Sequence, residues 1–416
     1  MMSSINSHLT YDRANRVFCL ALVILICLRH AIGVAIPLPF VSLLSLVVFL
    51  TAQPRRACLN TPLAWFVAIY GLSLLLHPAP ELWLRTQRFL AFLIGMLCFS
   101  PLLTSDSLAK TRLRISVITY YVLSAMVFLS FLVWLASFIQ FGENGIWESG
   151  IHNYGFCGIF KMGMVLSPVS AIIAITAAFL LLEGKSKSKI KPFLNGLILL
   201  TGIIMCVAGG SRMASVGLFL SLASLLIIKR HVLAQMLHNR LAIAMALSGT
   251  ILLIASSPYA LSVIRHKNII GESHGSLFYS RERLWHDRIE EFASSPLTGI
   301  GYANEFPSER NKGSLTEIEP GSSWLALMSY GGLVGLGCFL WFSAGLARML
   351  YRIRDDGRFP LCLAILLFLV INAFTEGWLM FAGSIIFPVF WLATSAVWAA
   401  KGKRKKHNIK SSYEND

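Results

Sequence analysis

The polar sequence SRERLWHDRIEEF, residues 280–292, lies inside the longest hydrophilic interval of the chain, residues 261–323. The same interval contains SPLTGIG at residues 295–301 and most of EPGSSW at residues 319–324. Apolar segments flank the interval on both sides, and short connectors join the other apolar segments. A single long polar insertion in such a chain predicts a cap outside the membrane over a bundle of membrane-embedded helices.

The composition of the 416 residues is that of a membrane protein, because 56% are hydrophobic, only 13% are charged and the mean hydropathy is +0.67. Apolar segments of spanning length fall at 17–36, 38–52, 61–77, 88–104, 115–140, 163–183, 193–209, 213–228, 241–258, 324–347, 360–375 and 378–399. They predict an all-α polytopic membrane protein with about twelve transmembrane helices and one large outer loop. The expected divisions are helices 1–9 in residues 1–260, the loop in 261–323, helices 10–12 in 324–400 and a basic tail in 401–416.

The net charge of +16 follows a pattern along the chain. When the predicted spans alternate in direction, most of the 36 lysines and arginines fall on one side, together with both termini and the run KGKRKK at residues 401–406. The positive-inside rule assigns that side to the cytoplasm. The charge therefore predicts membrane topology and contact with anionic lipids rather than a nucleic-acid partner.

Residues 280–292 predict a helix with Ser280 as its N-cap, ending before Pro296. Helical periodicity places the side chains at 281, 285, 288 and 292 on one face and those at 283, 287 and 290 on the other. Arg283 therefore has acidic neighbours in its own helix, which predicts a solvated ion pair. Arg281 has no such acid four residues later, so we expect its partner elsewhere: a substrate phosphate, or a glutamate at position 305, 309 or 319.

Arg212 follows Gly209-Gly210-Ser211 and opens a predicted span. A helix N-terminus favours an anion, and the glycines permit a ligand to approach the backbone closely. We therefore favour anion binding by Arg212 over an anchoring role at the membrane interface. Arg85 and Arg88 at the outer entry to the fourth span raise the same two alternatives, with the anchor favoured.

Two carboxylates on the outer side are candidates for acid–base chemistry. Glu319 lies in a Pro-Gly turn just before the tenth span, where Ser322 or Ser323 can cap the helix. A carboxylate held there is a candidate general base toward a sugar hydroxyl. Glu376, between the last two spans, is the rival base or an arginine partner.

Other motifs point away from nucleotide or metal chemistry. The sequence has no P-loop, no dinucleotide-binding glycine pattern and no zinc-type spacing of histidines and cysteines, so we expect no metal and no cofactor. The glycine-rich run GGLVGLG at residues 331–337 predicts a close-packing helix surface.

Taken in order, these motifs resemble the O-antigen ligase/polymerase family of bacterial envelope glycosyltransferases. The resemblance covers most of the chain and is most specific from Arg212 to Gly335. The motifs that carry it are GGSRMAS at 209–215, an arginine followed four residues later by Trp285, PLTGIG at 296–301 and GLVG at 332–335.

The resemblance implies a GT-C-like, inverting, metal-independent transferase with a periplasmic loop, acting at the periplasmic face of the bacterial inner membrane. Its substrates would be undecaprenyl-pyrophosphate-linked oligosaccharides, with Arg212 and Arg281 binding the pyrophosphate. Arg288, Arg88 and Ser322 complete the expected substrate-binding set.

Three features favour the polymerase branch of the family. Gly321-Ser322 stand where the ligases carry His-Asn, and RFLAFLIG at 88–95 and GFCGIFK at 155–161 resemble polymerase segments. We therefore expect an exopolysaccharide or O-antigen polymerase, with a chain-length regulator and a flippase as candidate partners. The alternatives are a ligase that transfers the glycan to lipid A core, and a transporter or flippase. A flippase should carry charges along mid-membrane helices, whereas the ionisable residues here lie mainly at the span ends.

Overall fold

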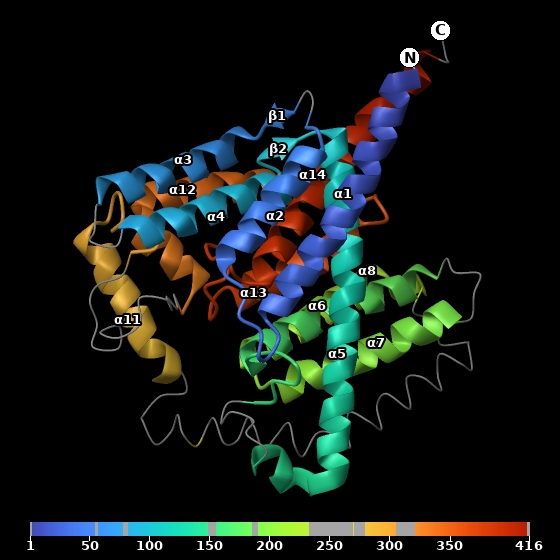
Figure 1. Ribbon diagram of the computed structural model, residues 1–416, viewed down its shortest axis with the longest axis vertical. Coiled ribbons are helices and arrows are strands. Elements are labelled where there is room, and N and C mark those ends of the chain that lie inside the picture. The colour runs from blue at the N-terminus through green and yellow to red at the C-terminus, as the bar shows by residue number, and fades with distance from the viewer. Residues whose placement is uncertain are drawn as a thin grey trace.

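The computed structural model describes residues 2–54, 57–77, 82–148, 155–184, 190–232, 269, 279–304 and 321–413, and this part of the chain is mainly helical (Figure 1). The helices are α1 (Met2–Arg29), α2 (Leu38–Thr51), α3 (Thr61–Leu76), α4 (Leu82–Phe99), α5 (Asp106–Glu148), α6 (Gly163–Glu183), α7 (Ile190–Ala208), α8 (Arg212–Ile228), α11 (Tyr279–Ser294), α12 (Ser323–Arg352), α13 (Phe359–Asn372) and α14 (Ile386–Tyr413). Two short strands, β1 (Cys58–Leu59) and β2 (Leu103–Thr104), pair antiparallel.

The helices coincide with the apolar segments predicted as spans, which is consistent with an all-α membrane protein. In the described part of the chain, α6, α7, α12 and the first 32 residues of α5 are long and apolar enough to cross a membrane. Helices α2, α3, α8, α13 and the apolar part of α14 are shorter. The predicted span 241–258 and much of the outer loop lie outside the described residues, so the number of spans stays a prediction.

The end of the first span was predicted incorrectly. Helix α1 ends at Arg29, whereas the apolar sequence continues to residue 36. The backbone after α1 joins the connector before α6, because the N–H of Lys161 donates to the carbonyl of His30 (2.9 Å) and Ala31 forms an isolated bridge with Phe160. Contact with a distant segment, which composition does not reveal, therefore ends this helix.

The start of the last span was also predicted incorrectly. Helix α14 begins at Ile386 rather than near residue 378, and residues 373–385 form a series of turns. Trp378 and Met380 in this segment are nevertheless buried. The indole Nε1 of Trp378 donates to Asn372 Oδ1 (3.0 Å), and the hydroxyl of Tyr302 donates to the carbonyl of Met380 (2.7 Å). An apolar composition here reflects a buried irregular segment rather than a helix.

Connectors predicted on the same side of the membrane contact one another. On one side, β1 pairs with β2 and the hydroxyl of Ser107 donates to the carbonyl of Gln53 (3.1 Å). On the other, the N–H of Phe156 donates to the carbonyl of Ala208 (2.9 Å). The start of α1 and the end of α14 lie together at the top of Figure 1. These contacts agree with the alternating directions predicted for the described helices, while the number of spans and the assignment of that end to the cytoplasm stay predictions.

Helix α12 is interrupted at Gly332, whose backbone angles are φ 60° and ψ −160°. The N–H groups of Leu333 and Val334 donate instead to the carbonyls of Pro296 (2.8 Å) and Leu297 (3.2 Å), in the turn that follows α11. A Cβ atom at Gly332 would lie 2.3 Å from the carbonyl oxygen of Leu297. The turn is thus inserted into the break in α12, and only glycine fits there.

The carbonyls released by the break also have new partners. The carbonyl of Ser329 accepts from the N–H of Ile300 (2.8 Å), and that of Tyr330 accepts from the hydroxyl of Ser73 on α3 (2.6 Å). These two carbonyls and the N–H groups of Leu333 and Val334 therefore each gain a new partner, as an apolar environment favours.

The glycine-rich run serves close packing at two of its positions. Cβ atoms at Gly331 and Gly335 would lie 2.6 and 2.9 Å from the ring of Tyr70 on α3, which confirms the predicted packing surface there. The break at Gly332 was not predicted. At Gly337 a Cβ atom would meet nothing within 4 Å.

We predict that Gly332→Ala destabilises the protein by about 2 kcal/mol or more, because its Cβ meets backbone and its backbone angles are almost restricted to glycine. Thermal unfolding in detergent micelles measures the effect. Gly337→Ala, on the same helix, is the matched control and should raise stability by roughly 0.5–1 kcal/mol. Equal unfolding temperatures for the two variants would contradict this account of the break.

A second prediction concerns pH. The Nε2 atom of His30 accepts a hydrogen bond from the N–H of Ile385 (3.0 Å), so the folded protein holds the neutral imidazole. Burial, Arg29 and Lys161 lower the pKa of His30 to about 4 from an ordinary value of 6.5. Between pH 6.5 and about pH 4 the unfolded chain therefore binds more protons than the folded protein. The free energy of unfolding falls as the pH is lowered through this range.

We expect acidification from pH 7 to pH 5 to cost the wild type on the order of 1–2 kcal/mol more than His30→Gln, which keeps an acceptor but does not titrate. Unfolding midpoints measured across this range test the difference. Identical pH profiles for the two proteins would show that His30 is not responsible.

Candidate active site

The buried face of α11 carries the two arginines that the helical periodicity placed there. Arg281 and Arg288 are 9% and 4% exposed, whereas Arg283 is exposed, so the predicted division of α11 into two faces is confirmed. The helix already includes Tyr279, however, so Ser280 lies within its first turn and is not the residue before it.

Helix α11 packs on the start of α12. The indole Nε1 of Trp285 donates to the carbonyl of Gly321 (3.2 Å), and a Cβ atom at Gly321 would lie 2.7 Å from Cβ of Leu284. Gly321 also has a positive φ of 70°. A larger residue at this position would therefore push α11 away from α12.

Arg281 forms an ion pair with Glu376. Its Nη2 atom donates to Oε1 of Glu376 (2.9 Å) and lies 3.9 Å from Sδ of Met164 on α6. The two side chains are 11% and 20% exposed, so the pair is accessible from one side. Arg281 therefore has a partner outside its own helix, as expected, and Glu376 is an arginine partner. Glu319 and the glutamates at 305 and 309 lie outside the described residues.

The backbone of Glu376 is held by the N-terminus of α12. The carbonyl of Glu376 accepts from the hydroxyl (2.6 Å) and from the N–H (3.0 Å) of Ser323, whose hydroxyl also accepts from the N–H of Leu379 (3.2 Å). Ser322 is the N-cap, its hydroxyl accepting from the N–H of Leu325 (3.5 Å). The predicted capping role of Ser322 is thus confirmed, and Ser323 positions the carboxylate segment.

Arg212 is the first residue of α8, behind the N-cap Ser211, whose hydroxyl accepts from the N–H of Ala214 (3.4 Å). The preceding glycines allow the turn to lie against α6. A Cβ atom at Gly209 would be 2.3 Å from Oγ of Ser167. Arg212 therefore occupies the helix N-terminus predicted for it, with α6 as its neighbour.

The segments that carry Arg212 and Arg281 both contact the first turn of α6. A Cβ atom at Gly163 would lie 2.7 Å from the carbonyl oxygen of Gly209, in the turn before Arg212, while the next residue, Met164, contacts Arg281. The turn before Arg212 and the side chain of Arg281 thus both contact the first turn of α6. Positive side chains and a helix N-terminus are features that favour a polyanion.

Arg288 links α11 to α12 beside the break. Its Nη2 atom donates to Oε1 of Glu291 (2.8 Å), and Oε2 of Glu291 accepts from the hydroxyl of Ser329 (2.5 Å). The guanidinium also lies 5.8 Å from the ring centroid of Tyr330. Because Arg288 and Glu291 are both buried, these contacts orient α11, and contact between Arg288 and a substrate stays a prediction.

Arg88, on α4, lines a small pocket together with Leu38, Tyr302 and Ala382. The pocket lies against the same 373–385 segment that carries Glu376. Arg88 therefore borders this segment, and contact between Arg88 and a substrate stays a prediction.

His286, Asp287 and Glu290 form a group on α11 whose possible ligand atoms lie within 4.8 Å of one another. His286 and Glu290 are exposed, and their Nδ1 and Oε1 atoms are 3.5 Å apart. Exposed groups of this kind are common without an ion. We interpret this one as charged surface.

Sequence reasoning missed several of these positions. Ser323 was expected only as a possible cap, and nothing in the sequence singles out Met164. Glu291 could have been found, because it lies three residues after Arg288 and next to its helix face. Its burial depends on Ser329, which the sequence does not connect to α11.

A family model described as O-antigen ligase matches residues 197–340. The match covers the end of α7, α8, α11 and the first part of α12, and it includes Arg212 and Arg281 but not Glu376. No curated protein matches the chain.

The matched family implies a glycosyltransferase-like ligase or polymerase activity and lipid-linked glycan substrates in the membrane. Together with the apolar helices, it indicates a multi-pass membrane protein with a role in polysaccharide biosynthesis. The domain match over residues 197–340 thus confirms the resemblance of this chain to the O-antigen ligase/polymerase family.

Proposed function

We propose that this protein polymerises undecaprenyl-pyrophosphate-linked oligosaccharide repeat units into a surface polysaccharide at the periplasmic face of the inner membrane. The observation that carries the proposal is the partly exposed Arg281–Glu376 pair beside the first turn of α6, which the turn before Arg212 also contacts. The pair of a guanidinium and a carboxylate, with the segment of Arg212 against the same turn of α6, supports a site on the predicted outer side. Transfer of a glycan from a diphosphate requires positive groups that stabilise the leaving diphosphate and a carboxylate that accepts the proton of the acceptor hydroxyl.

Arg281 and Arg212 would bind the diphosphate of the donor. A diphosphate carries more negative charge than one carboxylate and accepts bidentate hydrogen bonds from a guanidinium, so it can replace Glu376 as the partner of Arg281. The N-terminus of α8 adds backbone N–H groups and the positive end of a helix dipole beside Arg212. The positive charge stabilises the diphosphate as it leaves, without a metal ion.

Glu376, released from Arg281, would then act on the acceptor. The hydroxyl oxygen of the acceptor sugar forms a bond to the anomeric carbon of the donor, and its proton passes to the carboxylate. The bond from that carbon to the diphosphate oxygen breaks, and the electron pair leaves with the diphosphate. Attack opposite the leaving group inverts the configuration at the anomeric carbon. Glu319 is the alternative base.

The other expected site residues would support binding. Ser322 holds the start of α12, Arg288 orients α11 and Arg88 lies beside the segment that carries Glu376. Residues 261–323 would form the periplasmic cap and the basic tail would lie in the cytoplasm. A flippase and a chain-length regulator are the partners that polymerisation requires for substrate supply and product length.

The ligase reaction is the second candidate, because the matching family model is described as O-antigen ligase. The donor and its leaving group would be the same, and the acceptor would be lipid A core. Gly321 and Ser322 stand where ligases of the family carry His-Asn, which favours polymerisation. In cells, loss of polymer attachment while polymerised lipid-linked chains persist would identify a ligase.

We predict that Arg281→Ala and Arg212→Ala each abolish chain extension while the protein still inserts and accumulates, because each removes positive charge from the leaving diphosphate. Purified protein is supplied with a defined lipid-linked repeat unit, without nucleotide or metal, and the ladder of products is scored. Arg283→Ala, on the exposed face of α11, is the matched control and should retain the ladder. Normal product lengths in either site variant would contradict the assignment.

We further predict that Glu376→Gln lowers the rate of extension by about 100-fold or more while donor binding persists, since the amide keeps the size of the side chain but accepts a proton poorly. Turnover and lipid binding are measured separately. If Glu376→Gln turns over at the wild-type rate, the general base lies elsewhere.

A further inference from the structure

A groove runs between α1 and α2 on the surface of the helical bundle. Its lining is apolar and includes Phe18 and Leu25 from α1 and Phe40, Leu43 and Val47 from α2, around a cavity of about 500 Å³. Phe40 and Leu43 are 59% and 60% exposed. From Phe18 to Leu25 the groove extends about 10 Å along the helix axis. In a membrane such a groove is filled by hydrocarbon.

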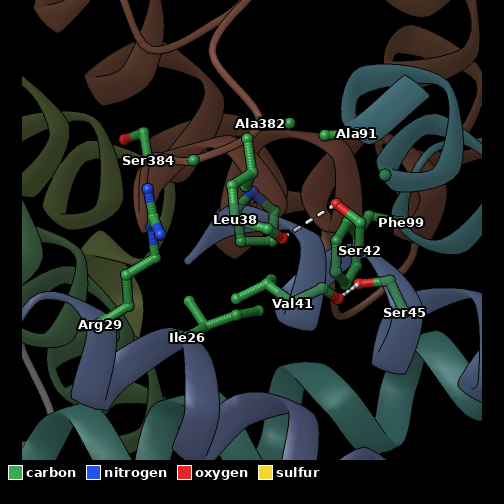
Figure 2. A pocket seen from close by; sticks show the side chains of 13 residues that line it. Ile26, Arg29, Leu38, Val41, Ser42, Ser45, Ala91, Phe99, Ala382 and Ser384 are labelled. Atoms are coloured by element: carbon green, nitrogen blue, oxygen red, sulfur yellow. Dashed lines mark hydrogen bonds between the residues drawn. The ribbon is translucent and has the colours of Figure 1, made fainter. Parts of the chain in front are cut away.

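Arg29 lies at the outer end of this groove. Its guanidinium donates to the carbonyl of Ile36, which lines the groove, and reaches toward Ser384 on the other side (Figure 2). A Cβ atom built at Gly383 would lie 3.5 Å from its Nη2 atom. Among the described residues no carboxylate pairs with Arg29. A half-buried guanidinium that donates to a carbonyl and has no carboxylate partner in the described part of the chain is suited to an anion.

A second positive charge lies close to Arg29. Lys161 is exposed, and its backbone N–H donates to the carbonyl of His30, the residue after Arg29. The charges of Arg29 and Lys161 together lower the pKa of His30, as expected for two cations near one imidazole. The outer end of the groove is therefore cationic.

The Arg29 end of the groove borders the segment that carries Glu376. A small pocket at Arg29 is lined by Leu38 and Ala382, which also line the pocket of Arg88. Ala382 belongs to the 373–385 segment, and Glu376 lies six residues before it. The cationic end of the groove and the carboxylate segment are therefore neighbours in the fold.

We propose that the groove between α1 and α2 binds the hydrocarbon chain of the lipid-linked acceptor, with the acceptor's diphosphate at Arg29. The inference rests on the proposed function, because polymerisation joins two lipid-linked molecules and only one diphosphate can lie at Arg281. The apolar lining from the two helices suits a hydrocarbon chain. The two cations at its outer end, Arg29 and Lys161, match the charge of a diphosphate better than the single phosphate of an ordinary phospholipid.

The test counts the molecules of undecaprenyl pyrophosphate bound to the full-length protein by native mass spectrometry from detergent. We expect two bound molecules for the wild type. Arg29→Gln keeps a donor toward the carbonyl of Ile36 but loses the charge, and should weaken the second molecule by about tenfold or more. Arg29→Lys should retain most of this binding. Arg16→Gln, 13 residues before Arg29 on α1, where Arg16 pairs with Asp12, is the matched control and should have no effect.

A second variant pair tests the groove without touching Arg29. Leu43→Trp fills the groove from an exposed position and should also weaken the second molecule, whereas Leu50→Trp, 59% exposed on the same helix outside the groove lining, should not. Unchanged binding in Arg29→Gln and Leu43→Trp overturns the inference. So does displacement of the second molecule by an equal concentration of phosphatidylglycerol, which would mark the groove as a site for ordinary phospholipid.

The outcome is separable from the proposed function. If the wild type forms no ladder of products from a defined repeat unit, the proposed function fails whatever the groove binds. If the ladder forms normally and Arg29→Gln neither loses the second lipid nor slows extension, only the assignment of the acceptor to this groove fails.

Discussion

A helix in an apolar environment can be broken only where the backbone groups it releases find other partners. At Gly332 the exchange is complete on both sides: the carbonyls of Pro296 and Leu297 receive the two N–H groups, and Ile300 and Ser73 donate to the two released carbonyls. The turn that enters the break is continuous with α11. This backbone exchange therefore fixes where α11 lies over the bundle, and with it the direction from which its buried arginines approach.

The segment before α14 obeys the same constraint. It is irregular and buried, and its backbone at Glu376 is held by Ser323 at the N-terminus of α12. Both members of the ion pair are thus attached to α12, Arg281 through the turn in the break and Glu376 through the first turn of the helix. The relative position of the guanidinium and the carboxylate is set by one helix rather than by the long loop, so the pair can be maintained even if other parts of the cap rearrange.

The periodicity and spacing of residues in the sequence were sufficient to predict part of this structure. Periodicity predicted the helices and the two faces of α11, and the lack of an acid four residues after Arg281 predicted that this arginine needs a partner outside the helix. Contacts distant in sequence were not predictable. The Gly332 break depends on a turn that precedes it by a long interval, and the buried carboxylate of Glu291 accepts a hydrogen bond from the hydroxyl of Ser329 on another helix. Counting charges along the sequence has the same limit, because it does not reveal whether a charged side chain is buried. Arg112 counts as a cytoplasmic charge, yet its guanidinium is buried and donates to the carbonyls of Leu97, Cys98 and Leu103.

The ion pair also explains how a charged site can persist at a membrane surface. A guanidinium or a carboxylate alone in partly desolvated surroundings is costly, whereas each compensates the other in the pair between Arg281 and Glu376. An incoming diphosphate can replace the carboxylate as the partner of the guanidinium only if its own hydrogen bonds offset the loss of the ion pair. In the proposed mechanism the carboxylate is then free to accept a proton while a leaving group is bound, and it returns to the guanidinium when the diphosphate departs. In the proposed mechanism, exchange of partners therefore couples activation of the acceptor to occupation by the donor.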